Sequence, residues 1–177
     1  SREWVLPANR ASGEFRQVDI PRSVRDAIGL RLTRLPDELR QLIGSIAVAA
    51  RPVAADVMAH MHGTSRLRVA AMAEGLIERG LVDEQEGRYR VAHMLIGEAV
   101  RSSLSTARRT ELHRALSLGM EAAASPKRLA ERAGDIAWHA EWGGDHTRAF
   151  RFALLASDTA AAQLAFEEAQ SYLALAA

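Results

Sequence analysis

Histidine is the residue type in this chain that could both bind metal and transfer protons, and the sequence contains six. His60 and His62 are two residues apart, so on a helix they point to different sides and make poor joint metal ligands. His139 and His146 flank a predicted turn with only two carboxylates close by. The sequence therefore predicts no metal site.

Other catalytic groups are also missing from the sequence. The chain has no cysteine, which excludes a thiol nucleophile, a thiolate metal site and a disulfide. It has no glycine-rich loop followed by lysine and serine or threonine, and no serine elbow. We expect no catalytic residues, and no cofactor bound by this chain alone.

Charge and hydropathy limit the classes of partner that the chain is expected to bind. The 23 basic residues nearly cancel the 22 acidic ones, so the overall charge favours neither nucleic acid nor membrane. No apolar run approaches the roughly 18 to 20 residues that span a bilayer, and the chain does not begin with a signal peptide. We expect a soluble cytoplasmic protein without a membrane partner.

Residues 1–19 show no strong hydrophobic periodicity and are interpreted as a connector from a preceding domain. Two predicted helices follow them. The first helix covers residues 21–35, and the second starts at Pro36, because proline suits the first helical turn. The apolar stripe of the first helix comprises Val24, Ala27, Ile28, Leu32 and Leu35, and that of the second Leu39, Leu42, Ile43, Ile46 and Ala47.

The stretch from Ala54 to Val91 predicts helix, turn, helix and hairpin in that order. A helix over residues 54–61 stops at Gly63, and Thr64 or Ser65 caps the next helix. Leu81 and Val82 form a strand, residues 83–87 turn the chain, and residues 88–91 return. This order is typical of a winged helix with a small β-hairpin wing. The predicted buried stripe of its longer helix is Val69, Met72, Ala73, Leu76 and Ile77.

Helices fill the rest of the chain. Residues 94–104 and 110–120 add two helices behind the wing, and the composition shifts after Ser125 and Pro126. Three further helices are predicted at 129–142, 145–161 and 165–177, where alanines alternate with aromatic residues as in tetratricopeptide-like repeats. The predicted fold is mostly α: a winged-helix domain over 20–124 and a truncated helical arm over 125–177.

Several segments together resemble one family. Residues 20–28 and 31–36 look like the segment that leaves the ATPase core of STAND-type signal-transduction ATPases, especially the large LuxR-type bacterial regulators. Residues 78–82 resemble their helix-to-wing junction, residues 89–100 resemble the strand and histidine that follow, and residues 149–177 are similar to the start of their arm. The resemblance covers residues 20–177 and implies a fragment of a larger regulator.

The resemblance gives His93 a specific role. In STAND ATPases the histidine that begins the helix after the wing contacts the ADP phosphate in the closed state, and His93 stands at that position. An imidazole can donate to a phosphate oxygen and titrates near neutrality. The alternative is a half-buried histidine that ends a strand and bonds to backbone. This chain departs from the commoner pattern at Ala92, where relatives often carry a basic residue.

A DNA-reading role is the second hypothesis. Arg66 and Arg68 would approach DNA from the recognition helix, with Arg88 and Arg90 in the wing. Acidic residues on the same helix and in the wing would face phosphate and oppose such binding. An autonomous winged-helix DNA-binding protein with a helical dimerisation tail is therefore the alternative function.

The preferred function is that of a regulatory fragment of an ATP-dependent LuxR-type transcriptional regulator. It couples nucleotide state to the binding of a signal or partner. The resemblance implies that a full-length protein uses ATP or ADP, with the ATPase domain of the same polypeptide packed on the winged helix. We expect an inducer or protein partner to bind the helical arm, and DNA to be bound through a separate output domain.

Overall fold

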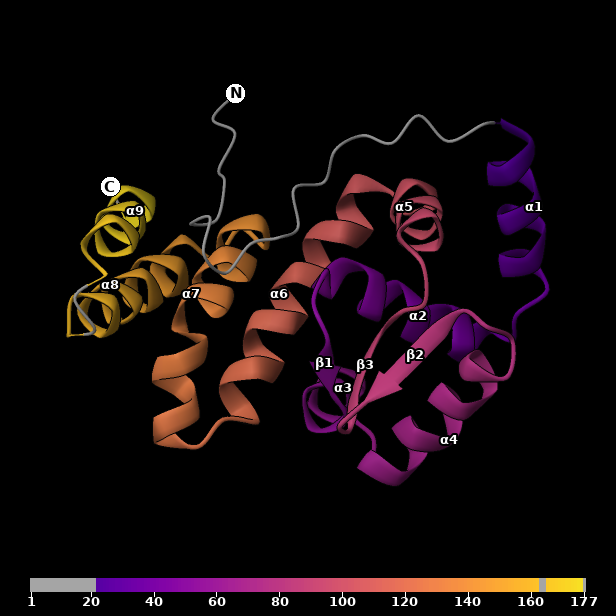
Figure 1. Ribbon diagram of the computed structural model, residues 1–177, viewed down its shortest axis with the longest axis horizontal. Coiled ribbons are helices and arrows are strands. Elements are labelled where there is room, and N and C mark those ends of the chain that lie inside the picture. Colours follow the sequence, from indigo (N-terminus) through magenta and orange to yellow (C-terminus); the bar gives the residue numbers. More distant parts are fainter. Residues whose placement is uncertain (1–21, 163–164, 177) are drawn as a thin grey trace.

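The computed structural model describes residues 22–162 and 165–176, which are mostly helical with one small antiparallel sheet (Figure 1). The predicted connector over residues 1–19 lies outside these ranges. The described helices are α1 (Arg22–Thr33), α2 (Asp37–Ala49), α3 (Ala55–His62), α4 (Arg66–Ile77), α5 (Met94–Ser103), α6 (Thr106–Ala122), α7 (Pro126–Trp142), α8 (His146–Ala162) and α9 (Phe166–Ala176). The strands are β1 (Val53–Ala54), β2 (Val82–Gln85) and β3 (Arg88–Val91).

Helices α1 and α2 form where the apolar spacing predicts them, with two corrections. Ala27 is exposed, although it was expected on the buried stripe of α1; the side chain of Val24 is outside the described part. Pro36 precedes α2 with extended backbone (ψ 148°), so it is the N-cap and not the first helical residue. Asp37 and Glu38 occupy the first turn, where carboxylates favour the positive end of a helix.

The sheet has one strand more than the predicted hairpin. Its order is β1-β3-β2, and β1 pairs antiparallel with β3 through Val53 opposite Tyr89. A strand of two residues directly before α3 has no alternating pattern that a sequence could reveal. The pairing brings the start of α3 to the edge of the hairpin.

The wing hairpin is longer and its turn tighter than expected. Residues 83–85 were predicted to turn, but they belong to β2 and pair with residues 88–90 of β3. Glu86 and Gly87 make the turn with φ of 53° and 71°. Two left-handed residues give the two-residue turn whose twist matches the strands, so the acidic residues before it remain in the strand.

The core around the sheet is built from large aliphatic side chains. On α4 the residues at helical spacing from Val69 to Leu76 are buried, as predicted, but Ile77 is 38% exposed. Ile77 is the last residue of α4 and lies at the edge of the buried stripe, which explains its exposure. The largest fully buried side chains here include Leu42, Ile43, Ile46, Met58, Leu76 and Leu81.

Helices α6 to α9 pack in sequence, each against the next, and α7 to α9 stack beside α6 in Figure 1. α6 also packs on α2 and α3, so one apolar cluster continues from the sheet into these helices. Glycine allows the closest approaches: a Cβ on Gly143 would lie 2.7 Å from the backbone of Arg114, and one on Gly134 would lie 2.5 Å from the Tyr172 hydroxyl.

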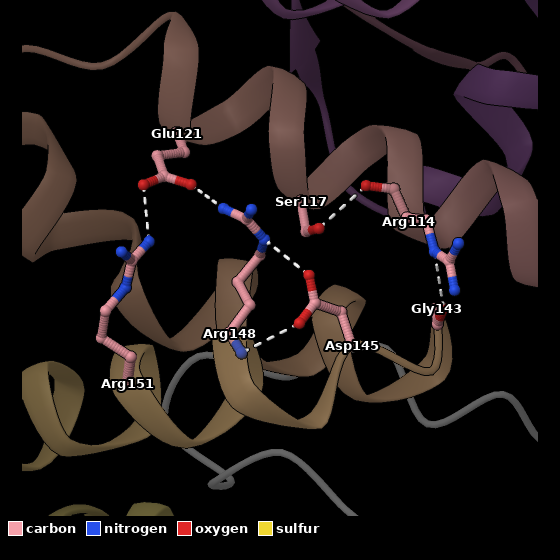
Figure 2. Close-up of polar contacts among 7 residues, drawn as sticks. All are labelled: Arg114, Ser117, Glu121, Gly143, Asp145, Arg148 and Arg151. Atoms are coloured by element: carbon pink, nitrogen blue, oxygen red, sulfur yellow. Dashed lines mark hydrogen bonds and ion pairs between the residues drawn. The ribbon is translucent and has the colours of Figure 1, made fainter.

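A polar network joins α6 to α8 across the turn between α7 and α8 (Figure 2). The Glu121 carboxylate accepts hydrogen bonds from Arg148 and, at 2.6 Å, from Arg151. Arg148 also donates to Asp145 at 3.0 Å, and Arg114 donates to the Gly143 carbonyl at 3.2 Å. None of the described helices is long and apolar enough to cross a membrane.

Candidate functional site

His93 stands at the junction between the wing and α5. The Ala92 amide donates to the Leu81 carbonyl at 3.1 Å, which closes the sheet, and His93 follows in extended conformation. Its imidazole caps α5, because Nδ1 accepts a hydrogen bond from the Leu95 amide at 3.2 Å. The His93 side chain is exposed, so the alternative prediction of a half-buried histidine is wrong. The hydrogen bond to backbone that this alternative predicted is present.

The cap fixes which nitrogen of His93 carries the proton when the ring is neutral. Because Nδ1 accepts from an amide, it carries the lone pair, and the proton of the neutral ring is on Nε2. The first turn of α5 contains no acidic residue, so the positive end of the helix is not compensated there. An exposed donor beside this helix end suits an anionic group such as a phosphate oxygen.

Glycine and arginine hold α5 against the hairpin. A Cβ on Gly97 would lie 3.1 Å from Val91 Cγ2 and 3.1 Å from the Arg101 guanidinium, so a larger residue would push α5 from β3. Arg101 donates to the Ala47 carbonyl at 3.1 Å and pairs with Glu98 at 3.0 Å. These contacts orient the helix that His93 caps.

The four arginines of the DNA hypothesis have different surroundings. Arg68 forms an ion pair with Glu38, and Arg90 lies 3.7 Å from the Asp83 carboxylate. Arg66 and Arg68 are two residues apart on α4, so they point in different directions, whereas Arg88 and Arg90 share the exposed side of β3. At least two of the four are therefore engaged with carboxylates.

The tip of the wing is acidic, and one of its carboxylates stabilises the turn. Glu84 accepts a hydrogen bond from the Gly87 amide at 2.7 Å and so stabilises the turn. Glu84 and Glu86 are both exposed. A DNA phosphate next to this tip would meet negative charge.

His139 has a different partner from the one that the sequence suggested. It is 2% exposed, and its Nδ1 lies 2.9 Å from Nδ1 of His113, while His146 pairs with Glu141 at 3.0 Å. Burial, followed by the charge of Arg109, lowers the pKa of His113 to about 4. Burial, His113 and Arg51 hold the pKa of His139 well below its usual value. Both rings are therefore neutral near pH 7.

The pair of His113 and His139 lies where α2, α6 and α7 meet. His139 of α7 hydrogen-bonds to the backbone of Ala49, the last residue of α2. Arg51, two residues later, donates to Asp135 of α7 at 2.8 Å. These contacts join α7 to the end of α2. The pair could not be predicted from the sequence, because its members are 26 residues apart on different helices.

A second pair that sequence reasoning missed is Ser45 with His62. Ser45 Oγ lies 3.0 Å from His62 Nε2 and donates to the Gln41 carbonyl at 3.1 Å. Among the described residues, no group of three or more histidine, aspartate or glutamate side chains is placed to hold a metal ion. Comparison of the chain with protein-family models, curated proteins and solved structures gave no match.

Proposed function

We propose that this chain is the winged-helix and helical-arm part of a nucleotide-controlled transcription regulator, similar to the STAND-type, LuxR-like regulators. Residues 20–124 are its winged-helix domain and residues 125–177 its tetratricopeptide-like arm. Support comes from the order of α3, α4, β2 and β3, and from the pairing of β1 with the hairpin. The sequential packing of α7, α8 and α9 supports the arm.

The observation that carries the proposal is the state of the His93 side chain. Its Nδ1 is occupied by the Leu95 amide, which leaves the Nε2–H of this exposed side chain as a donor at the uncompensated end of α5. We propose that this N–H donates to a phosphate of ADP held by an ATPase domain of the same polypeptide. Such a bond forms only when the two domains are closed.

The switch is a difference in free energy between closed and open arrangements. A ligand that binds one arrangement better shifts the population toward it, so the His93 contact needs to supply only a few kcal/mol. Binding of an inducer or protein partner at the arm favours the open arrangement. DNA is then bound by a separate output domain, and the regulator acts in the cytoplasm.

The junction of α2 and α7 provides a route from the arm to the winged helix. His139 and Arg51 connect α7 directly to the end of α2. The same α2 contacts α5, the helix that His93 caps, and Arg101 of α5 bonds to the Ala47 carbonyl of α2. A displacement of the arm therefore reaches the His93 site through α2 and α5.

A DNA-binding protein remains the second candidate because of two residues at the start of α4. Leu67 is 81% exposed and Arg66 is also exposed, and a recognition helix presents such residues to the major groove. The ion pairs of Arg68 and Arg90 and the acidic wing tip favour the first proposal.

Two binding measurements on this chain separate the proposals. Calorimetry with ADP should give a dissociation constant no tighter than millimolar, because the phosphate-cradling loop belongs to the ATPase domain. Fluorescence anisotropy with labelled duplex DNA should show no micromolar binding at about 50 mM salt. Micromolar ADP binding by this chain would contradict the first proposal. DNA binding that weakens steeply toward about 200 mM salt would favour the second.

A further inference from the structure

A pocket of about 380 Å³ lies between α2, α3 and α6, on residues that the His93 proposal does not use. One part of its wall is apolar and is made by Met61 of α3 with Leu112 and Ala115 of α6. The remaining wall is polar. A pocket of this size and composition holds a small molecule with both an apolar and a polar part.

His62 forms a fixed, uncharged part of the wall. Ser45 Oγ lies 3.0 Å from His62 Nε2 and 3.1 Å from the Gln41 carbonyl oxygen, so a buried hydroxyl holds the imidazole in place. Burial and the charge of Arg108 lower the pKa of His62, which favours the neutral ring. Ser45 is fully buried, so its hydroxyl is not accessible to a substrate as a nucleophile.

Arg108 contributes the arginine side chain of the pocket wall. Its side chain lines the pocket and is exposed, and among the described residues no carboxylate lies within ion-pair distance of its guanidinium. The planar fork of a guanidinium matches a carboxylate with two parallel hydrogen bonds. An acidic ligand group therefore has a partner at the mouth of the pocket.

Glu111 limits the charge of that ligand. It lines the same pocket one helical turn after Arg108 and is exposed. A second negative charge on the ligand would meet this carboxylate, which costs free energy at such short range. The wall thus favours a single carboxylate over a dicarboxylate.

We propose that this pocket binds a small monocarboxylic acid. The carboxylate pairs with Arg108, and the alkyl part lies against Met61 and Leu112. The site is independent of the nucleotide contact of His93, and it occupies the place where α6 passes from the winged-helix region toward the arm.

The test uses hexanoate as the probe and follows the backbone amides of the 177-residue chain by NMR. We expect saturable shifts at Met61, Leu112 and Ala115. Hexanol and hexylammonium, which lack the carboxylate, should bind at least about tenfold more weakly. Adipate, with the same number of carbons and a second carboxylate, should also bind more weakly. Hexanoate shifts that do not saturate at tens of millimolar would overturn the proposal, as would equal binding of hexanol.

Matched variants assign the binding to the pocket. Arg108→Gln should weaken hexanoate at least about tenfold. Arg109→Gln, at the next exposed residue of α6 outside the pocket wall, should leave it unchanged. Glu111→Gln should improve the binding of adipate relative to hexanoate. Equal losses in the two arginine variants, or an unchanged ratio in Glu111→Gln, would contradict the proposed ligand geometry. Amide spectra of each variant verify that the fold is kept.

Discussion

The region around the sheet, α1 to α5, and the helical arm, α7 to α9, are built from different side chains. The first fills its interior largely with valine, leucine, isoleucine and methionine, whereas the arm places alanine at most of its buried positions. Alanine removes less apolar area from water per residue but lets helices approach closely. The arm therefore depends more on the fit between helices, and the sheet region more on the volume of its core.

The ion pairs differ in how exposed they are. Glu121 of α6 binds Arg148 and Arg151 of α8 and thereby links the arm to α6. In the sheet region, Arg68 and Arg90 form pairs that are about half exposed, whereas Arg101 pairs with Glu98 in a less exposed position. Since exposed pairs contribute little, the pairs of Arg148 and Arg101 should matter more than those of Arg68 and Arg90.

The largest expected effect is a cavity in the sheet region. Leu76→Ala removes a fully buried side chain and should lower the free energy of unfolding by roughly 2 to 5 kcal/mol. Ile77→Ala, at the partly exposed neighbour, is the control and should cost about 1 kcal/mol or less. Urea unfolding measures both. Equal losses would mean that the helical phase of α4 is wrong.

In the arm, an added methyl group should be destabilising. Gly143→Ala places a methyl group 2.7 Å from the Arg114 backbone and should lower the free energy of unfolding by about 1 to 3 kcal/mol. Gly29→Ala has no atom within 4 Å of the new methyl and, in helix α1, should raise it by about 0.5 to 1 kcal/mol. If Gly143→Ala left the free energy of unfolding unchanged, α6 and the turn could move apart without destabilising the fold.

Low pH should destabilise the junction between the two regions. The pKa of His113 is about 4 when folded and about 6.5 when unfolded, so the unfolded chain binds more protons between these values. The free energy of unfolding should therefore fall as the pH drops through this window, by up to about 1.4 kcal/mol per pH unit for each such histidine. His113→Phe should reduce the slope, and His60→Ala should not. Identical slopes in all three proteins would exclude this cause.

The smallest expected effect concerns the network of Figure 2. Glu121→Gln removes the charge that Arg148 and Arg151 share and should cost about 1 kcal/mol or less. The loss should shrink at high salt, because screening weakens the pairs in the wild type. Glu78→Gln, at an exposed carboxylate without an ion pair among the described residues, should be neutral at any salt concentration. Thermal melts at two salt concentrations decide whether the network stabilises the arm.

Periodicity predicted the helices because each is long enough to repeat its apolar stripe. Ser65 and Gly80 could also be predicted to bound α4, since both act on neighbouring residues. Strand β1 could not be predicted, because it consists of two residues that are defined only by their partner strand. The turn was placed too early because its acidic residues are compatible with either strand or loop.

The candidate sites also divide into those that neighbouring residues predict and those that only the folded chain brings together. The place of His93 at the start of a helix could be predicted from the residues next to it, whereas its contact with nucleotide comes from the family resemblance and stays a prediction. The pairs Ser45 with His62 and His113 with His139 join residues 17 and 26 positions apart, so only the packing of helices brings them together. The Arg108 pocket depends on three helices for the same reason.

The role of His93 is tested most directly by ADP retention in the intact regulator to which we assign this chain. His93→Ser keeps a side-chain cap for α5 but lacks the imidazole Nε2–H, and exposed His60 provides the control His60→Ala. Melting of the same variants of this chain should show losses within about 1 kcal/mol, which excludes unfolding as the cause. We predict that His93→Ser loses bound ADP on gel filtration and raises basal transcription, while His60→Ala matches the wild type. Wild-type ADP content and basal output in His93→Ser would contradict the nucleotide role of His93.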